Sequence, residues 1–69
     1  MKPISGKRMC KVLEARGWVL SRIQSSHHIY LHRDFPGVTL AVPVHGNRDL
    51  GTGTQRSLMR RAGLADDDL

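Results

Sequence analysis

The feature that most constrains the fold of this chain is a run of three short segments with strand character, separated only by turns. Trp18–Gln24 is rich in aromatic and β-branched residues, Ile29–Arg33 alternates apolar with polar residues, and Val38–Val42 is a third short strand. The turns are Ser25-Ser26 and the stretch Asp34–Gly37, which contains a Pro-Gly pair. Because turns this short join antiparallel neighbours, we predict a three-stranded antiparallel meander.

A segment with helical periodicity precedes the strands. Met9 and Leu13 lie on one helix face, and Ser5 is placed to cap the first turn through its hydroxyl. Gly17 then provides the left-handed residue at which helices commonly end. We therefore predict an amphipathic helix over about Gly6 to Arg16.

A second segment with helical periodicity follows the strands. Thr52 and Gln55 fit a capping box, and Thr54 is a rival cap. Gly63, followed by Leu64, fits a left-handed helix end with its hydrophobic contact. The apolar stripe between these signals consists of Leu58, Met59 and Ala62.

The order of helix, three strands and helix predicts an α+β fold. In such a fold the two helices pack side by side on one face of the antiparallel sheet. A chain of 69 residues has room for one small core, so we interpret residues 1–69 as a single domain with a shallow site. The tail Leu64–Leu69 is expected to form a short acidic turn or to fray.

Alternation along the second strand divides its residues between two faces. Ile29 and Leu31 share one face, whereas His28, Tyr30 and His32 share the other. We expect the helices to cover the face with Ile29 and Leu31. The other face would then meet solvent or a partner.

The balance of charge predicts a polyanionic partner. The chain has 11 Lys and Arg residues against 6 Asp and Glu residues, and three of the acids cluster at Asp66–Asp68. The rest of the chain is therefore more basic than the net charge of +5 indicates. Such a surface favours nucleic acid.

The cysteine content and the hydropathy of the chain indicate the cell compartment in which it is expected. Cys10 is the single cysteine, which excludes an internal disulfide and a zinc site built on paired thiolates. No stretch is long and apolar enough to span a membrane. We therefore expect a cytoplasmic protein.

Two of the four histidines, His27 and His28, are adjacent where the first turn becomes the second strand. Imidazole takes and gives a proton near neutral pH, so this pair is a candidate for acid–base chemistry. His45, after the third strand, is expected either to hydrogen-bond within its loop or to take a minor part in the site. No metal site is predicted from His27, His28 and His32, because no carboxylate or thiolate stands at a recognised spacing.

Taken in order, these residues resemble the HicA-type toxins of bacterial and archaeal toxin–antitoxin pairs, small ribonucleases with a fold like that of double-stranded-RNA-binding domains. The resemblance covers nearly the whole chain. It rests on Gly17-Trp18, Ser26–Tyr30, Val42–His45, Gly53-Thr54, Arg56–Leu58 and Ala62–Leu64. The family usually reads Gly-Ser-His where this chain has Ser25-Ser26-His27, so the backbone freedom of a glycine is absent there.

The resemblance implies a toxin that cleaves messenger RNA with one histidine and no cofactor. It also implies a HicB-type antitoxin that binds the toxin, masks its site and links it into an oligomer. The catalytic histidine of the family falls on His27. Alternation places His27 on the expected core face, with Ile29 and Leu31, and it would be accessible because it is the first residue of its strand. His28 is the alternative, because it points with Tyr30 toward the accessible face.

The chemistry expected of such a site begins when a neutral imidazole removes the proton of the ribose 2′-hydroxyl. That oxygen attacks the adjacent phosphorus and gives a 2′,3′-cyclic phosphate and a 5′-hydroxyl, without a metal. The positive charge that the phosphorus needs is expected from Arg22, Arg33, Arg56 or Arg60. Tyr30 and His32 are further candidates for RNA contact, through stacking or a phosphate.

Two other classes of function fit the same residues. The first is an RNA-binding module without catalysis, or an inactive toxin-like copy, which would bind RNA in a salt-dependent way and leave it intact. The second is a protein-interaction domain whose basic surface serves an acidic partner. Cleavage assays and RNA affinity separate the three.

Overall fold

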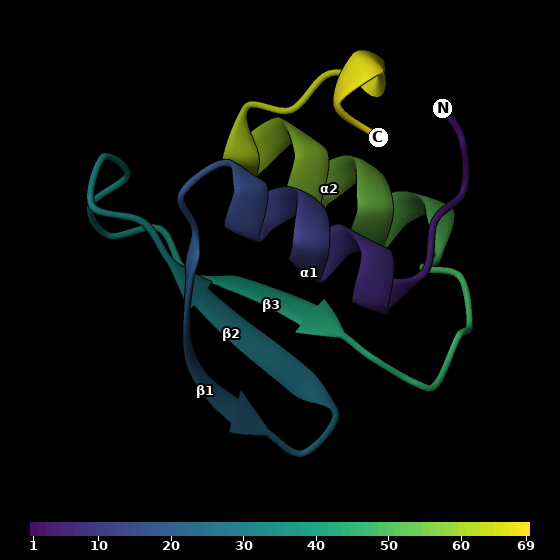
Figure 1. Cartoon of the computed structure of the whole chain (residues 1–69), viewed down its shortest axis with the longest axis horizontal. Coiled ribbons are helices and arrows are strands. Elements are labelled where there is room, and N and C mark those ends of the chain that lie inside the picture. Colours follow the sequence, from purple (N-terminus) through teal and green to yellow (C-terminus); the bar gives the residue numbers. More distant parts are fainter.

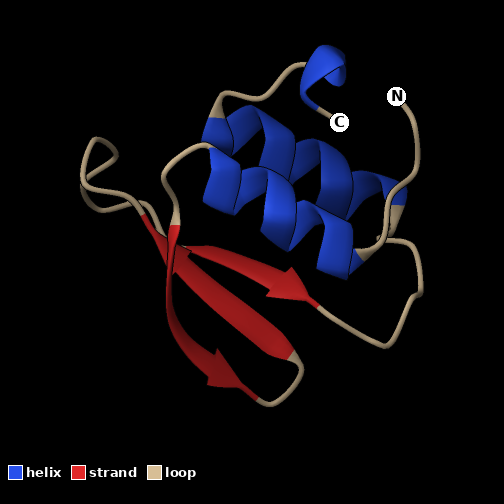
Figure 2. Ribbon diagram, viewed as in Figure 1, coloured by secondary structure: helices blue, strands red, loops and turns tan.

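The computed structural model describes residues 1–69 and has the predicted order of helix, three strands and helix. Its elements are α1 (Gly6–Ala15), β1 (Val19–Gln24), β2 (His27–Leu31), β3 (Leu40–Pro43), α2 (Thr52–Ala62) and the short 3₁₀ helix η1 (Asp66–Asp68). The two α-helices lie side by side over one face of the sheet (Figure 1), and no helix or strand covers the other face (Figure 2). The α+β prediction is confirmed. None of the helices is long and apolar enough to cross a membrane.

Both ends of α1 follow the local signals in the sequence. The Ser5 hydroxyl accepts a hydrogen bond from the Arg8 amide at 3.0 Å, which satisfies one of the free amides of the first turn. At the other end Gly17 has a φ of +92°, and the Trp18 amide donates to the Leu13 carbonyl at 3.0 Å. This is the left-handed helix end that was predicted, although the helix stops one residue earlier.

The start of α2 differs from the prediction. Gly51 is the N-cap residue and no side chain caps the helix, so the capping box of Thr52 and Gln55 is wrong, as is the rival cap from the next threonine. Gln55 is 1% exposed and faces inward. Its side-chain oxygen accepts from the Ile4 amide at 3.1 Å, and its side-chain nitrogen donates to the Lys2 carbonyl at 2.5 Å. A buried amide needs such partners, and here it joins α2 to the N-terminal segment.

The end of α2 and the tail agree with the sequence. Gly63 has a φ of +70°, and the Leu64 amide donates to the Met59 carbonyl at 2.8 Å. The chain then forms the acidic 3₁₀ turn η1, in which Asp68 makes an ion pair with Arg16 after the end of α1. The short acidic turn is thus confirmed.

The sheet is the predicted antiparallel meander, with the strand order β1-β2-β3. β2 begins at His27, two residues earlier than predicted, and β3 begins at Leu40, two residues later. The earlier start gives His27 a neighbour on each side, Gln24 in β1 and Pro43 in β3. A side chain at Gly6 would overlap the Pro43 carbonyl, so the start of α1 packs directly on this end of the sheet.

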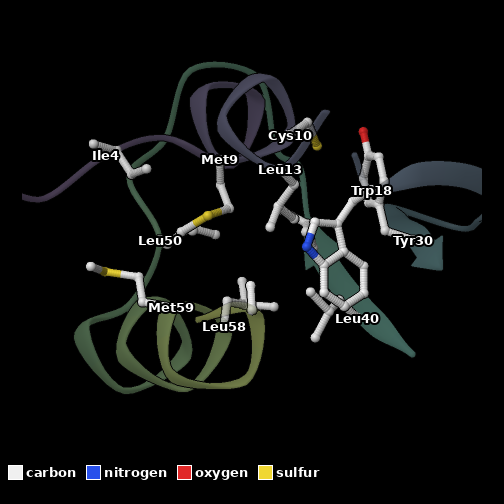
Figure 3. Close-up of a cluster of buried hydrophobic side chains, with 12 residues drawn as sticks. Ile4, Met9, Cys10, Leu13, Trp18, Tyr30, Leu40, Leu50, Leu58 and Met59 are labelled. Carbon is white, nitrogen blue, oxygen red and sulfur yellow. The ribbon is translucent and has the colours of Figure 1, made fainter. Parts of the chain in front are cut away.

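The core lies between the helices and the sheet (Figure 3). Tyr30 and Leu40 pair across β2 and β3 and are 1% and 0% exposed, whereas Leu31 is 45% exposed. The predicted assignment of faces is therefore wrong: the face of Tyr30, with His28 and His32, is the one that the helices cover. Alternation correctly divided the residues of β2 between two faces. The pattern is the same for both faces, so it does not say which of them the helices cover.

We call the uncovered side of the sheet the open face. Strand pairing and alternation place on it Val19, Arg22, Gln24, His27, Ile29, Leu31, Ala41 and Pro43. Val19 is 66% exposed, and Ile29, in the middle strand, is the buried residue of this face.

Candidate active site

His27 is the first residue of β2 and lies on the open face, exposed to solvent. The expectation that it shares a face with the core is wrong, since the helices cover the opposite side. Its backbone is held by both neighbouring strands, at Gln24 and at Pro43. The imidazole therefore stands on a rigid base and is accessible to a large ligand.

Arg22 lies on the same face as His27. It pairs with Ile29, which is two residues from His27 along β2. Diagonal neighbours on one face of a sheet are about 7–8 Å apart, which a long side chain bridges. Arg22 is exposed, so a phosphate that contacts His27 is within reach of its guanidinium.

The turn that precedes His27 has an unusual backbone. Ser25 has a φ of +56° and is the one residue other than glycine with positive φ. Positive φ at only the first residue of a two-residue hairpin turn is the pattern of a type II′ turn, which favours glycine there. The chain therefore forms, with serine, a turn that favours glycine.

His45 lies beside this hairpin turn. The Val44 amide donates to the Ser26 carbonyl at 2.8 Å, which extends the contact between the turn and the end of β3. The His45 Nε2 atom lies 3.5 Å from the Ser26 hydroxyl oxygen. His45 thus stands next to the residue that precedes His27, and it is exposed.

His28 points to the opposite side of β2 from His27 and is half-buried. It lines a shallow hollow of about 280 Å³ between α1 and the sheet. Lys7, Lys11 and Glu14 of α1 line the same hollow. The structure therefore separates the two candidate histidines by the thickness of the sheet.

Tyr30 was predicted to lie on the accessible face, and the structure corrects this. Its ring is buried in the core, and its hydroxyl donates to a Glu14 carboxylate oxygen at 2.6 Å. Burial, together with hydrogen bonds to Cys10 and Glu14, raises the pKa of Tyr30 well above its ordinary value. Burial likewise raises the pKa of the Cys10 thiol. With its ring enclosed, Tyr30 has no face free for a base.

His32 is held within the protein. Its Nε2 atom is 2.9 Å from the Arg16 carbonyl, and its Nδ1 atom accepts from the Asp34 amide at 3.0 Å. This arrangement requires the proton on Nε2, because Nδ1 is an acceptor. The ring also meets Trp18 and Phe35 edge-on, with centroids 5.1 and 5.0 Å apart. Both ring nitrogens are thus occupied by the fold.

The other three predicted arginines lie away from His27. Arg33 is exposed and follows the other end of β2, about 20 Å away at the rise of a strand. Arg56 and Arg60 are exposed on α2, which packs on the covered side of the sheet. Of the four predicted arginines the structure brings only Arg22 to the open face. No three His, Cys, Asp or Glu side chains lie together as metal ligands.

Comparison with protein families accounts for most of the chain. Residues 6–64 match the family described as the HicA toxin of bacterial toxin–antitoxin. The match runs from the first residue of α1 to the Leu64 contact that closes α2, and it includes the histidine pair. No curated protein matches the sequence. The chain therefore belongs to the HicA toxin family of bacterial toxin–antitoxin systems.

Proposed function

We propose that this toxin is a metal-independent endoribonuclease that cleaves messenger RNA and uses His27 as its general base. The observation that carries the proposal is the exposure of His27 on the open face, with Arg22 on the same face. His28 remains the alternative, and its half-buried position under α1 makes it the less accessible of the two.

The proposed reaction begins with the RNA and these two side chains. The imidazole of His27 removes the proton of a ribose 2′-hydroxyl, and that oxygen attacks the adjacent phosphorus. Positioned proton transfer contributes about 10²–10⁴-fold to the rate. The guanidinium of Arg22 donates hydrogen bonds to the phosphate oxygens, where negative charge accumulates. The bond between phosphorus and the 5′-oxygen breaks, and that oxygen takes up a proton. The products are therefore a 2′,3′-cyclic phosphate and a 5′-hydroxyl.

The open face also fits an antitoxin. Val19 and Leu31 are 66% and 45% exposed on the same face as Arg22. A HicB-type partner with an apolar centre would bury Val19 and Leu31. Its acidic side chains would form ion pairs with Arg22, and its surface would cover His27. Such an antitoxin both blocks RNA and links toxins into a larger assembly.

A second candidate is an RNA-binding protein without catalysis. The observation that favours it is Ser25, which has a left-handed backbone at a turn position that favours glycine. A strained turn that shifts His27 by an ångström would weaken catalysis and leave binding intact.

The test is to incubate the purified protein with single-stranded RNA in excess EDTA, beside His27→Ala and His28→Ala. Cyclic phosphate ends that are lost with His27→Ala alone would support the proposal. Loss with His28→Ala alone would move the site to the other face. Cleavage by His27→Ala at the wild-type rate would refute the assignment, and RNA that is bound but intact with the wild type would favour the second candidate.

A further inference from the structure

A second hollow lies beyond the hairpin turn, where β3 leads into α2. It has a volume of about 270 Å³ and is lined by Pro43, His45, Arg48, Asp49, Leu50 and Gly51. Its first residue, Pro43, is the pairing partner of His27. The hollow therefore adjoins the strand partner of the proposed general base.

His45 connects the two places. Pro43 pairs with His27, and paired Cα atoms in antiparallel strands are about 4.5–5.5 Å apart. His45 is two residues further along, and its Nε2 atom meets the hydroxyl of Ser26 at 3.5 Å. The imidazole of His45 thus lines the hollow and lies beside the hairpin turn.

The cleavage reaction is faster when an acid lies beside the leaving oxygen. In an in-line displacement the entering and leaving oxygens lie on opposite sides of the phosphorus. A base that takes the 2′-proton on one side is therefore badly placed to protonate the 5′-oxygen on the other. A departing alkoxide without a proton is a poor leaving group, so a second proton donor accelerates the step.

Of the four histidines in the chain, only His45 remains for this task. His28 points to the covered side of the sheet and borders the hollow under α1. Both ring nitrogens of His32 are used by Arg16 and Asp34. His45 is exposed and stands next to the turn that carries His27.

We propose that His45 is the general acid of the cleavage reaction; this inference rests on the proposed function. His27 takes the proton of the 2′-hydroxyl, and the 2′-oxygen forms a bond to phosphorus. The bond between phosphorus and the 5′-oxygen breaks, and its electron pair goes to that oxygen, which takes the proton of the His45 imidazolium. His27 is left protonated and His45 neutral, and proton exchange with water restores both.

The test compares two oligonucleotides of one sequence, one with the natural 5′-oxygen and one with sulfur in its place at the scissile bond. A thiolate leaves without a proton. His45→Ala and His45→Asn should slow cleavage of the natural RNA by about 10²-fold or more and cleave the sulfur substrate within a few-fold of the wild-type rate. His27→Ala should be slow on both, and Asn47→Ala, an exposed neighbour in the same loop, should be slow on neither.

Two results would overturn the proposal. One is cleavage of the natural RNA by the His45 variants at the wild-type rate while His27→Ala is inactive, which would leave the ribonuclease intact. The other is an equal loss on both substrates from variants with wild-type circular dichroism, which would make His45 a binding or positioning residue. Failure of the wild type to cut either substrate would refute the ribonuclease itself, and this inference with it.

Discussion

His27 and His28 are neighbours in the chain, yet they lie on opposite faces of β2. His27 is exposed on the open face, with Arg22, and His28 is half-buried beside α1. A strand turns successive side chains to opposite sides, so no small shift brings both imidazoles to one phosphate. The pair is therefore not placed to act as an acid and a base on one phosphate.

Replacement of Arg22 tests the charge on the open face. Arg22→Ala should lower the cleavage rate by about 10²-fold, because it removes hydrogen-bond donors from the phosphate in the transition state. Arg33→Ala makes the same change of charge at the far end of β2 and should reduce the rate by a few-fold at most. Single-turnover rates with excess protein measure both. Equal losses from the two variants would mean that only overall charge matters.

Replacement of Ser25 tests the strain of the hairpin turn. Ser25→Gly should stabilise the protein by about 1 kcal/mol, since the left-handed conformation costs a residue with a Cβ more than glycine loses in chain entropy. For a chain of this size the melting temperature should rise by about 4–8 °C. Ser26→Gly, at a residue without positive φ, should give no such rise. A lower melting temperature for Ser25→Gly would contradict the turn assignment.

The same Ser25→Gly variant also bears on activity. If the serine displaces His27, the glycine variant should cleave RNA faster than the wild type, and if the turn is already correct the two rates should agree. Initial cleavage rates at one salt concentration distinguish these outcomes, because RNA affinity falls steeply with salt.

Replacement of Gln55 tests how the N-terminal segment is held. Gln55→Leu removes both hydrogen bonds to this segment and leaves the Ile4 amide unpaired in the core. The free energy of unfolding should fall by about 2–3 kcal/mol, measured by urea denaturation. Thr52→Ala is the matched control, because no side chain caps α2, and it should change stability by less than about 0.5 kcal/mol. A larger loss of stability for Thr52→Ala than for Gln55→Leu would mean that the capping box does form.

The burial of the Tyr30 hydroxyl should make the protein less stable at alkaline pH. Burial raises the pKa of its hydroxyl above the ordinary value of about 10, so the folded protein keeps a proton that the unfolded chain releases. The contribution of the Tyr30 hydroxyl to the free energy of unfolding is complete below pH 10, and it declines as the pH rises above that value. The wild type should therefore lose more stability than Tyr30→Phe between about pH 9.5 and 11. Urea denaturation of both across that range measures the difference, and parallel curves would contradict the burial of the hydroxyl.

Much of the fold follows from contacts between residues that are close in the chain. The Ser5 cap, the left-handed Gly17 and Gly63 and the antiparallel meander were all predicted, because each depends on a few consecutive residues. The catalytic assignment to His27 comes from a resemblance to related sequences and remains a proposal. The local pattern at Thr52 and Gln55 was misleading, since the partners of Gln55 are more than fifty residues away.

The sequence by itself determined the order of the elements and which residues of β2 share a face, because periodicity and helix ends are local properties. Only the tertiary structure decided which face the helices cover. That choice depends on distant contacts such as the one between Tyr30 and Glu14, 16 residues apart, and on a core that encloses an aromatic ring. It placed His27 and Arg22 on the open face and brought His45 to the hairpin turn. Alternation is symmetric between the two faces, and only the packing of the helices removes that symmetry.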